Sequence, residues 1–254
     1  MRIMSTTKNT PEVQRVSQPA QLFIGLMGLG GAAIVGWVAL SVRAWPHLPF
    51  LAMLAIAVPA SRLKLKLPGL NGNMSVNLPF ILLAAVTLSA FEALVIGMLS
   101  ATVQSLPRGG GKIKAVQVIF NLSTMAIAVG LASVILHGGT HVLSAWASTS
   151  RLLVLAGTGL LLAQTFPVAT IISLTEGGSL HRIWFHIFQL SFPYYVLSTG
   201  ITSLMTTISQ HLGWQIPLLT LPLMYAIYRS YQLYFRAAEA QPSALLRAKA
   251  AATS

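Results

Sequence analysis

The sequence contains no cysteine and no aspartate, and its only acidic residues are four glutamates. Without cysteine, the chain forms no disulfide and offers no thiolate to a metal ion. Charged residues occupy 8% of its 254 positions, whereas a soluble domain carries charge at about a quarter of its positions. The few acids and six histidines do not supply a nucleophile, a base and an orienting group at a recognisable spacing. These absences exclude an ordinary soluble domain, and we expect no enzyme, no cofactor and no metal site.

Long apolar stretches dominate what is present. Apolar residues make up 55% of the chain, and its mean hydropathy is +0.73. Because about 20 apolar residues span a bilayer as a helix, the sequence predicts an all-α fold, a polytopic transmembrane helix bundle at residues 21–236. We expect a cytoplasmic segment at 1–20 before it and a short cytoplasmic tail at 237–254 after it. The apolar stretches cover residues 21–42, 46–60, 76–106, 115–136, 152–173, 184–208 and 215–235.

The stretch at 76–106 decides the topology, because it is either one long tilted helix or a short helical hairpin. Basic loops at 62–66 and 108–114 flank it, and short cytoplasmic loops collect Lys and Arg. Only a hairpin places both loops on the side of the basic N-terminus. The sequence therefore predicts about eight membrane segments with both termini cytoplasmic, in the cell inner membrane. In this arrangement every basic residue except Arg43 and Arg151 lies on the cytoplasmic side.

The net charge of +12 does not indicate a nucleic-acid partner. The basic residues are spread over successive loops beside the membrane, and no soluble domain gathers them into a groove. We expect the lipid bilayer, not nucleic acid, to be the surface that these charges face.

Some apolar segments are short for a membrane crossing. Residues 46–60, and each half of the hairpin, fall below the length of about 20 residues that a spanning helix needs. Prolines at 46, 49, 59, 79 and 107 flank these segments. Two interpretations are open: broken or re-entrant helices buried inside the bundle, as in transporters, or full spans across a locally thinned bilayer.

Four polar residues within the apolar segments are candidate ligand-binding residues: Glu92, Gln104, Gln117 and Asn121. Glu92 lies where the hairpin turns, near residues 89–92. It is either a helix-starting acid at the hairpin tip or a ligand or proton site. Gln117 and Asn121 lie one helical turn apart, and each either bonds a neighbouring helix or lines a small-ligand site. The predicted site lies between the hairpin and the helix of Asn121.

Two further patterns concern partners. Gly25, Gly28, Ala32 and Gly36 form a small-residue face on the first helix, which suits close helix packing and permits a homodimer without demanding one. The last segment ends in tyrosines three residues apart with arginines between them, which is typical of a membrane interface. We expect Arg229, Tyr231 and Arg236 to form a cytoplasmic interface.

Several short motifs together resemble a known family. They are the runs at residues 63–77 (LKLKLPGLNGNMSVN), 90–93 (AFEA), 120–123 (FNLS) and 225–231 (YAIYRSY). As a set they resemble the membrane sensor modules of bacterial signalling proteins of the MASE kind. Such modules are commonly followed by HD-type phosphodiesterase or GGDEF cyclase domains. We expect no such domain after residue 236, so the resemblance implies the sensory half, without cyclic-dinucleotide catalysis.

Three functions remain open at this point. The leading hypothesis is a non-enzymatic sensor-like module that binds a small or lipophilic signal and relays it to a cytoplasmic signalling protein. The alternative is a small transporter or a substrate-binding membrane subunit, which short broken helices would equally suit. The third is a scaffold or a degenerate remnant without a ligand.

Overall fold

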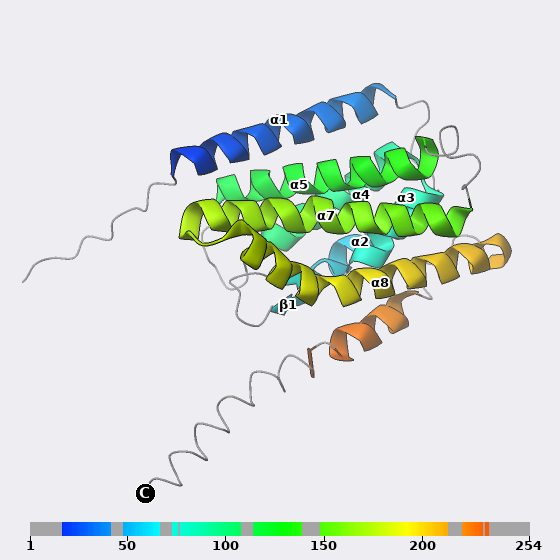
Figure 1. Ribbon diagram of the computed structural model, residues 1–254. Coiled ribbons are helices and arrows are strands. Elements are labelled where there is room, and N and C mark those ends of the chain that lie inside the picture. The colour runs from blue at the N-terminus through cyan, green and yellow to red at the C-terminus, as the bar shows by residue number, and fades with distance from the viewer. Residues whose placement is uncertain are drawn as a thin grey trace, which may run out of the picture.

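The computed structural model is a bundle of helices with one short pair of strands (Figure 1). It describes residues 17–41, 48–66, 73–75, 77–107, 114–138, 148–212, 220–230 and 232–233. The π-helical turn Val134–Gly138 continues α5, and a further helical run covers residues 220–230. The other elements are α1 (Gln18–Leu40), α2 (Leu48–Ala60), β1 (Lys64–Lys66), β2 (Asn73–Ser75), α3 (Leu78–Thr87), α4 (Ala90–Ser105), α5 (Ala115–Ser133), α7 (Thr149–Glu176) and α8 (Leu180–Leu212).

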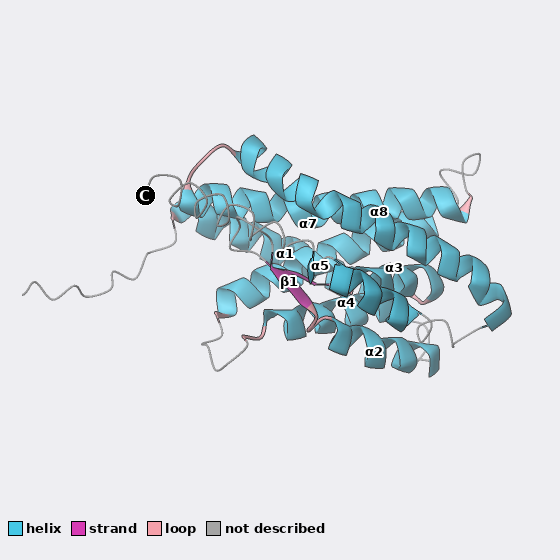
Figure 2. Ribbon diagram, turned by 90° about the horizontal axis from the view of Figure 1, so that it is seen from below, coloured by secondary structure: helices cyan, strands magenta, loops and turns pink. Residues whose placement is uncertain are grey.

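The structure adds one short pair of strands to the all-α bundle that the sequence predicts. β1 and β2 pair antiparallel, with Lys64 opposite Ser75 and Lys66 opposite Asn73, and β1 is drawn in magenta in Figure 2. Strands of three residues are too short to show a two-residue periodicity in the sequence. The prediction of a helical bundle is otherwise confirmed for the described residues.

The direction of α5 relative to α1 bears on the predicted hairpin. The rings of Phe23 and Phe120 lie 6.2 Å apart between centroids, and further along both helices Ile34 packs against Gly130. The two helices are therefore parallel, and they lie side by side in Figure 1. If α2 crosses the bundle, a single crossing by residues 76–106 would make them antiparallel, whereas a hairpin makes them parallel. The arrangement supports the hairpin.

The chain breaks between α3 and α4 where the sequence predicts the turn. α3 ends at Thr87, and α4 begins at Ala90 with Ser89 as its N-cap. The Asn121 side chain on α5 bonds Ser105 at the end of α4, so the start of α5 lies beside the end of α4. The predicted stretch is thus two short helices, of 10 and 16 residues.

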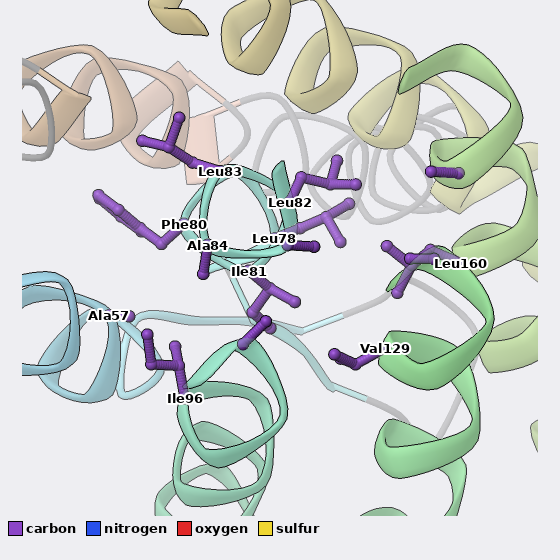
Figure 3. Packing of buried hydrophobic residues seen from close by; sticks show 14 of the residues in the cluster. Ala57, Leu78, Phe80, Ile81, Leu82, Leu83, Ala84, Ile96, Val129 and Leu160 are labelled. Atoms are coloured by element: carbon purple, nitrogen blue, oxygen red, sulfur yellow. The ribbon is translucent and has the colours of Figure 1, made fainter. Parts of the chain in front are cut away.

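α3 lies at the centre of the hydrophobic core. Every residue from Leu78 to Ala85 is buried, and α3 contacts α2, α4, α5, α7 and α8. Figure 3 shows its side chains pointing outward on several sides, with Ala57, Ile96 and Val129 of neighbouring helices around them. A helix that is apolar all round is stable only where it is enclosed. Its 10 residues rise about 15 Å, half the hydrocarbon thickness. For α3, the structure thus favours a short helix buried inside the bundle.

Three described helices are long and apolar enough to cross a membrane. They are α1, α5 with its π-helical turn (residues 115–138), and α7, with 23, 24 and 28 residues. α2, α3 and α4 are apolar but shorter. Length and composition therefore support a membrane helix bundle, whereas the count of about eight segments stays a prediction.

The glycines that pack α1 against the bundle differ from the face that the sequence predicts. A Cβ atom at Gly31 would lie 2.7 Å from the Ser123 Cα on α5, so only glycine allows this approach. Around Gly25, Gly28 and Gly36, by contrast, no described atom lies within 4 Å of such a Cβ position. The predicted small-residue face therefore points away from the described bundle.

α7 and α8 form an antiparallel pair joined by a glycine turn. Gly177 and Gly178 have φ values of +79° and +100°, a left-handed region that favours glycine. Beyond the turn, the Trp184 indole nitrogen donates to the Thr165 hydroxyl at 3.3 Å. The turn brings the start of α8 back along α7, and α8 then continues across the bundle to α3.

Candidate functional site

Glu92 starts α4 through a reciprocal capping box. The Ser89 hydroxyl accepts the Glu92 backbone N–H at 3.3 Å and donates to the Glu92 Oε2 atom at 2.7 Å. The same Oε2 atom accepts the Ser89 backbone N–H at 3.0 Å. These bonds, together with the positive end of the helix dipole, stabilise a carboxylate that is only 9% exposed. The helix-starting role of Glu92 is confirmed, and its role as a ligand or proton site stays a prediction.

Asn121 joins two helices. Its Nδ2 atom, on α5, donates to the Ser105 hydroxyl on α4 at 3.0 Å, and that hydroxyl donates to the Ala101 carbonyl at 2.8 Å. The structure thus shows the interhelical bond that was one of the two interpretations of Asn121. Gln104 lies half-buried beside Ser105, and Gln117 is exposed one turn before Asn121.

The four predicted ligand residues do not converge. Gln104, Gln117 and Asn121 lie at the end of the bundle where α4 ends and α5 begins. Glu92 lies twelve residues before Gln104, in the first turn of α4, which separates the two by about 18 Å along the helix. Only a ligand about 18 Å long would contact Glu92 together with the other three, and their ligand role stays a prediction.

The predicted cytoplasmic interface is described only in part. Arg229 is exposed on the helical run 220–230, and its Nη1 atom donates to the Gln232 Oε1 atom at 3.1 Å. The opposite side of this run buries Met224 and Ile227 in the core. Tyr231 and Arg236 lie outside the described residues. Arg229 therefore lies on a helix face that points away from the bundle.

A polar junction between α3 and α8 was not anticipated from the sequence. The backbone N–H of Leu78, the first residue of α3, donates to the Tyr194 hydroxyl at 3.1 Å. The Thr202 hydroxyl donates to the Ser198 carbonyl at 2.9 Å and also lies 3.4 Å from the Pro79 carbonyl oxygen. Tyr194 and Thr202 are both fully enclosed, at 1% and 0% exposed. The first turn of α3 is thus bound to α8 through polar groups in the middle of an apolar core.

Two more polar side chains of this junction have no hydrogen-bond partner. They are the Asn77 Nδ2 atom, on the N-cap residue of α3, and the Ser198 Oγ atom, on α8. Asn77 is 3% exposed and Ser198 is 1% exposed. A buried polar atom without a partner costs about 1–3 kcal/mol, so such atoms in a native structure require an explanation. Elsewhere in the described bundle, the buried hydroxyls of Ser100, Thr124 and Ser133 also have no hydrogen-bond partner.

The sequence carries only a faint signal of this junction. Asn77 before Leu78-Pro79 is a recognisable helix start. Nothing in the sequence, however, indicates that Tyr194, more than a hundred positions later, meets that start. Among the described residues, no three His, Cys, Asp or Glu side chains come together at a distance that would hold a metal ion.

Comparison with known proteins gives one match. The family model of MASE9 matches residues 45–236, which includes α2, both strands and the helices from α3 onward. α1 lies before the matched region. No curated protein and no solved structure matches the chain.

Proposed function

Because the chain belongs to the MASE9 family, a membrane-associated sensor family, we propose that it binds a small or lipophilic signal within the membrane and relays it to a cytoplasmic signalling protein. The family match over most of the chain is the observation that carries this proposal. The apolar helices are consistent with a membrane location. The proposed module is not an enzyme: it changes shape, or stability, when the signal binds.

The proposed topology is multi-pass in the inner membrane, with both termini cytoplasmic. Its support is the distribution of Lys and Arg, together with the parallel course of α1 and α5. Single cysteines test it directly, since the native chain has none. Asn71→Cys and Gly110→Cys should react with a membrane-impermeant maleimide only from the cytoplasmic side, and Gly139→Cys only from outside. Labelling of Asn71→Cys and Gly110→Cys from opposite sides would overturn the hairpin topology.

The proposed output surface is the cytoplasmic end of the last helix, with Arg229, Tyr231 and Arg236. Arg229 supports it because its guanidinium is exposed while the opposite side of the same helix is held in the core. A change in the position of that helix within the core would therefore move Arg229 relative to a partner docked there.

The experiment is crosslinking in cells followed by affinity purification of the full chain. The Arg229→Ala and Arg236→Ala variants should each lose a cytoplasmic protein that the wild type captures. Arg151→Ala is the matched control, because Arg151 lies at the other end of the bundle, at the start of α7, in the predicted outer loop. Equal capture by all three variants and the wild type would contradict the relay.

A flux measurement distinguishes the sensor from the transporter alternative. Proteoliposomes containing the wild-type chain should accumulate no solute above protein-free liposomes. If they accumulate a solute and lose this activity on Glu92→Gln or Asn121→Leu, the chain is a transporter, and the sensor proposal fails.

A further inference from the structure

The junction of α3 and α8 has three properties that a polar site for a guest molecule requires. It lies at the start of a helix, where the helix dipole favours an electron-rich atom. It contains two side chains more than nine-tenths buried, Asn77 and Ser198, whose Nδ2 and Oγ atoms have no hydrogen-bond partner. Finally, its other polar groups, on Tyr194 and Thr202, already hold the two helices together.

The position of Ser198 on α8 directs it to the start of α3. Residues four apart on a helix share a face, and Ser198 lies four residues after Tyr194 and four before Thr202. Both of these neighbours reach the first turn of α3, at Leu78 and Pro79. Ser198 therefore faces the same turn, which Asn77 directly precedes in the chain. The two unpartnered groups belong to one place in the core.

The chemistry of the free groups defines the guest. An Asn Nδ2 atom can only donate a hydrogen bond, and a Ser hydroxyl can donate one as well, so the guest must offer an acceptor oxygen. No Lys or Arg is buried among the residues whose exposure the structure describes, and a carboxylate in an apolar core without a counter-charge is unfavourable. The acceptor is therefore uncharged. A carbonyl oxygen, with two lone pairs, can accept from both groups.

The apolar residues around the junction define the remainder of the bound molecule. α3 and α8 bury Phe80, Leu83, Ile201 and Met205 in the same apolar cluster. A guest that enters this core from the membrane must itself be apolar apart from its oxygen.

We propose that the α3–α8 junction binds the carbonyl oxygen of an uncharged, lipophilic molecule through Asn77 and Ser198. This inference rests on the proposed sensor function. It places the signal at the start of α3, and not at the site between Glu92 and Asn121 that the sequence predicts. Bound there, the guest adds hydrogen bonds between α3 and α8 and so strengthens their contact. α8 precedes the helical run 220–230, which shares the core, so the site is physically linked to the proposed output surface.

Photolabelling of the full-length protein in detergent tests the site. The probe is a long-chain methyl ketone that carries a diazirine, with the unlabelled ketone, the matched alkane and the matched carboxylate as competitors. Labelled peptides should come from α3 and α8, and only the ketone should compete. Asn77→Leu and Ser198→Ala should each lower labelling about tenfold, the effect of one lost hydrogen bond in an apolar site.

Two controls separate this site from alternatives. Thr124→Val removes another unpartnered buried hydroxyl, on α5, and Asn121→Leu alters the site predicted from sequence; both should retain wild-type labelling. Asn77 makes no side-chain cap bond, so Asn77→Leu removes no helix cap. The milder Ser198→Ala keeps the test valid if Asn77→Leu does not fold.

The outcomes distinguish the site from the sensor function. Labelling that is unchanged by both junction variants would overturn the site, and so would labelling that the carboxylate displaces as well as the ketone. Capture of the crosslinked partner does not depend on either of these results. Labelling that depends on Asn77 and Ser198 supports the site even if Arg229→Ala leaves partner capture unchanged, and in that case the relay alone fails.

Discussion

The contact of Gly31 with α5 predicts how α1 is held to the bundle. Alanine at position 31 would place a Cβ atom 2.7 Å from the Ser123 Cα, whereas carbon atoms in favourable contact lie about 3.5–4.0 Å apart. Because the obstacle is backbone, α1 must retreat by about 1 Å. A gap of this size forfeits a quarter to a half of the dispersion energy of the atoms that it separates, and such overpacking costs about 1–3 kcal/mol.

The matched control for this prediction is Gly25→Ala on the same helix, where a Cβ atom meets open space. Both substitutions gain the same helix propensity, about 0.5–1 kcal/mol, so their difference isolates the steric cost. Stability is measured by unfolding in mixed micelles with increasing SDS. We expect Gly31→Ala to be about 1–3 kcal/mol less stable than Gly25→Ala. Equal stability of the two variants would show that α1 does not pack at Gly31.

A helix cap, an interhelical hydrogen bond and a buried leucine each give a change in stability that can be measured. Ser89→Ala should cost about 0.5–2 kcal/mol, and it should not add to Glu92→Ala in a double-mutant cycle, because both remove one capping box; additive effects would contradict the reciprocal bonds. A double-mutant cycle of Asn121→Leu with Ser105→Ala, in the same unfolding assay, should give a coupling energy of about 0.6 kcal/mol, the average for hydrogen bonds between membrane helices. A coupling energy of zero would refute the bond. Leu82→Ala, at a fully buried position of α3, should cost about 2–5 kcal/mol, and a cost below that of an exposed leucine substitution would place α3 outside the core.

The sequence predicts those features of the fold that depend on composition and on local chemistry. Apolar runs and the placement of Lys and Arg indicate a membrane helix bundle. Glu92, an acid at the expected tip of the hairpin, marks a helix start within residues 76–106, and α4 begins there in the structure. In both cases the signal lies within a few residues of the feature that it predicts.

The features that the sequence does not predict depend on packing between distant segments. The sequence predicts a small-residue face of α1 at Gly25, Gly28, Ala32 and Gly36, but α5 meets α1 at Gly31. Spacing alone does not say which of two glycine faces a neighbour will take. Glu92 and Gln104, twelve positions apart, lie at the two ends of α4, which follows from the sequence once this segment is a single helix. The contact between Tyr194 and Leu78 joins segments whose sequences carry no sign of each other.

The enclosure of α3 has a consequence for how the protein is made. α3 has 10 residues, too few to span the bilayer, and its first backbone N–H is bound by Tyr194, which is synthesised 116 residues later. During translation, the Leu78 backbone N–H at the start of α3 therefore lacks its Tyr194 partner until α8 leaves the ribosome. Assembly of the centre of the bundle is a late event in biogenesis, and a ribosome that stalls before α8 releases a chain whose core is open to membrane quality control.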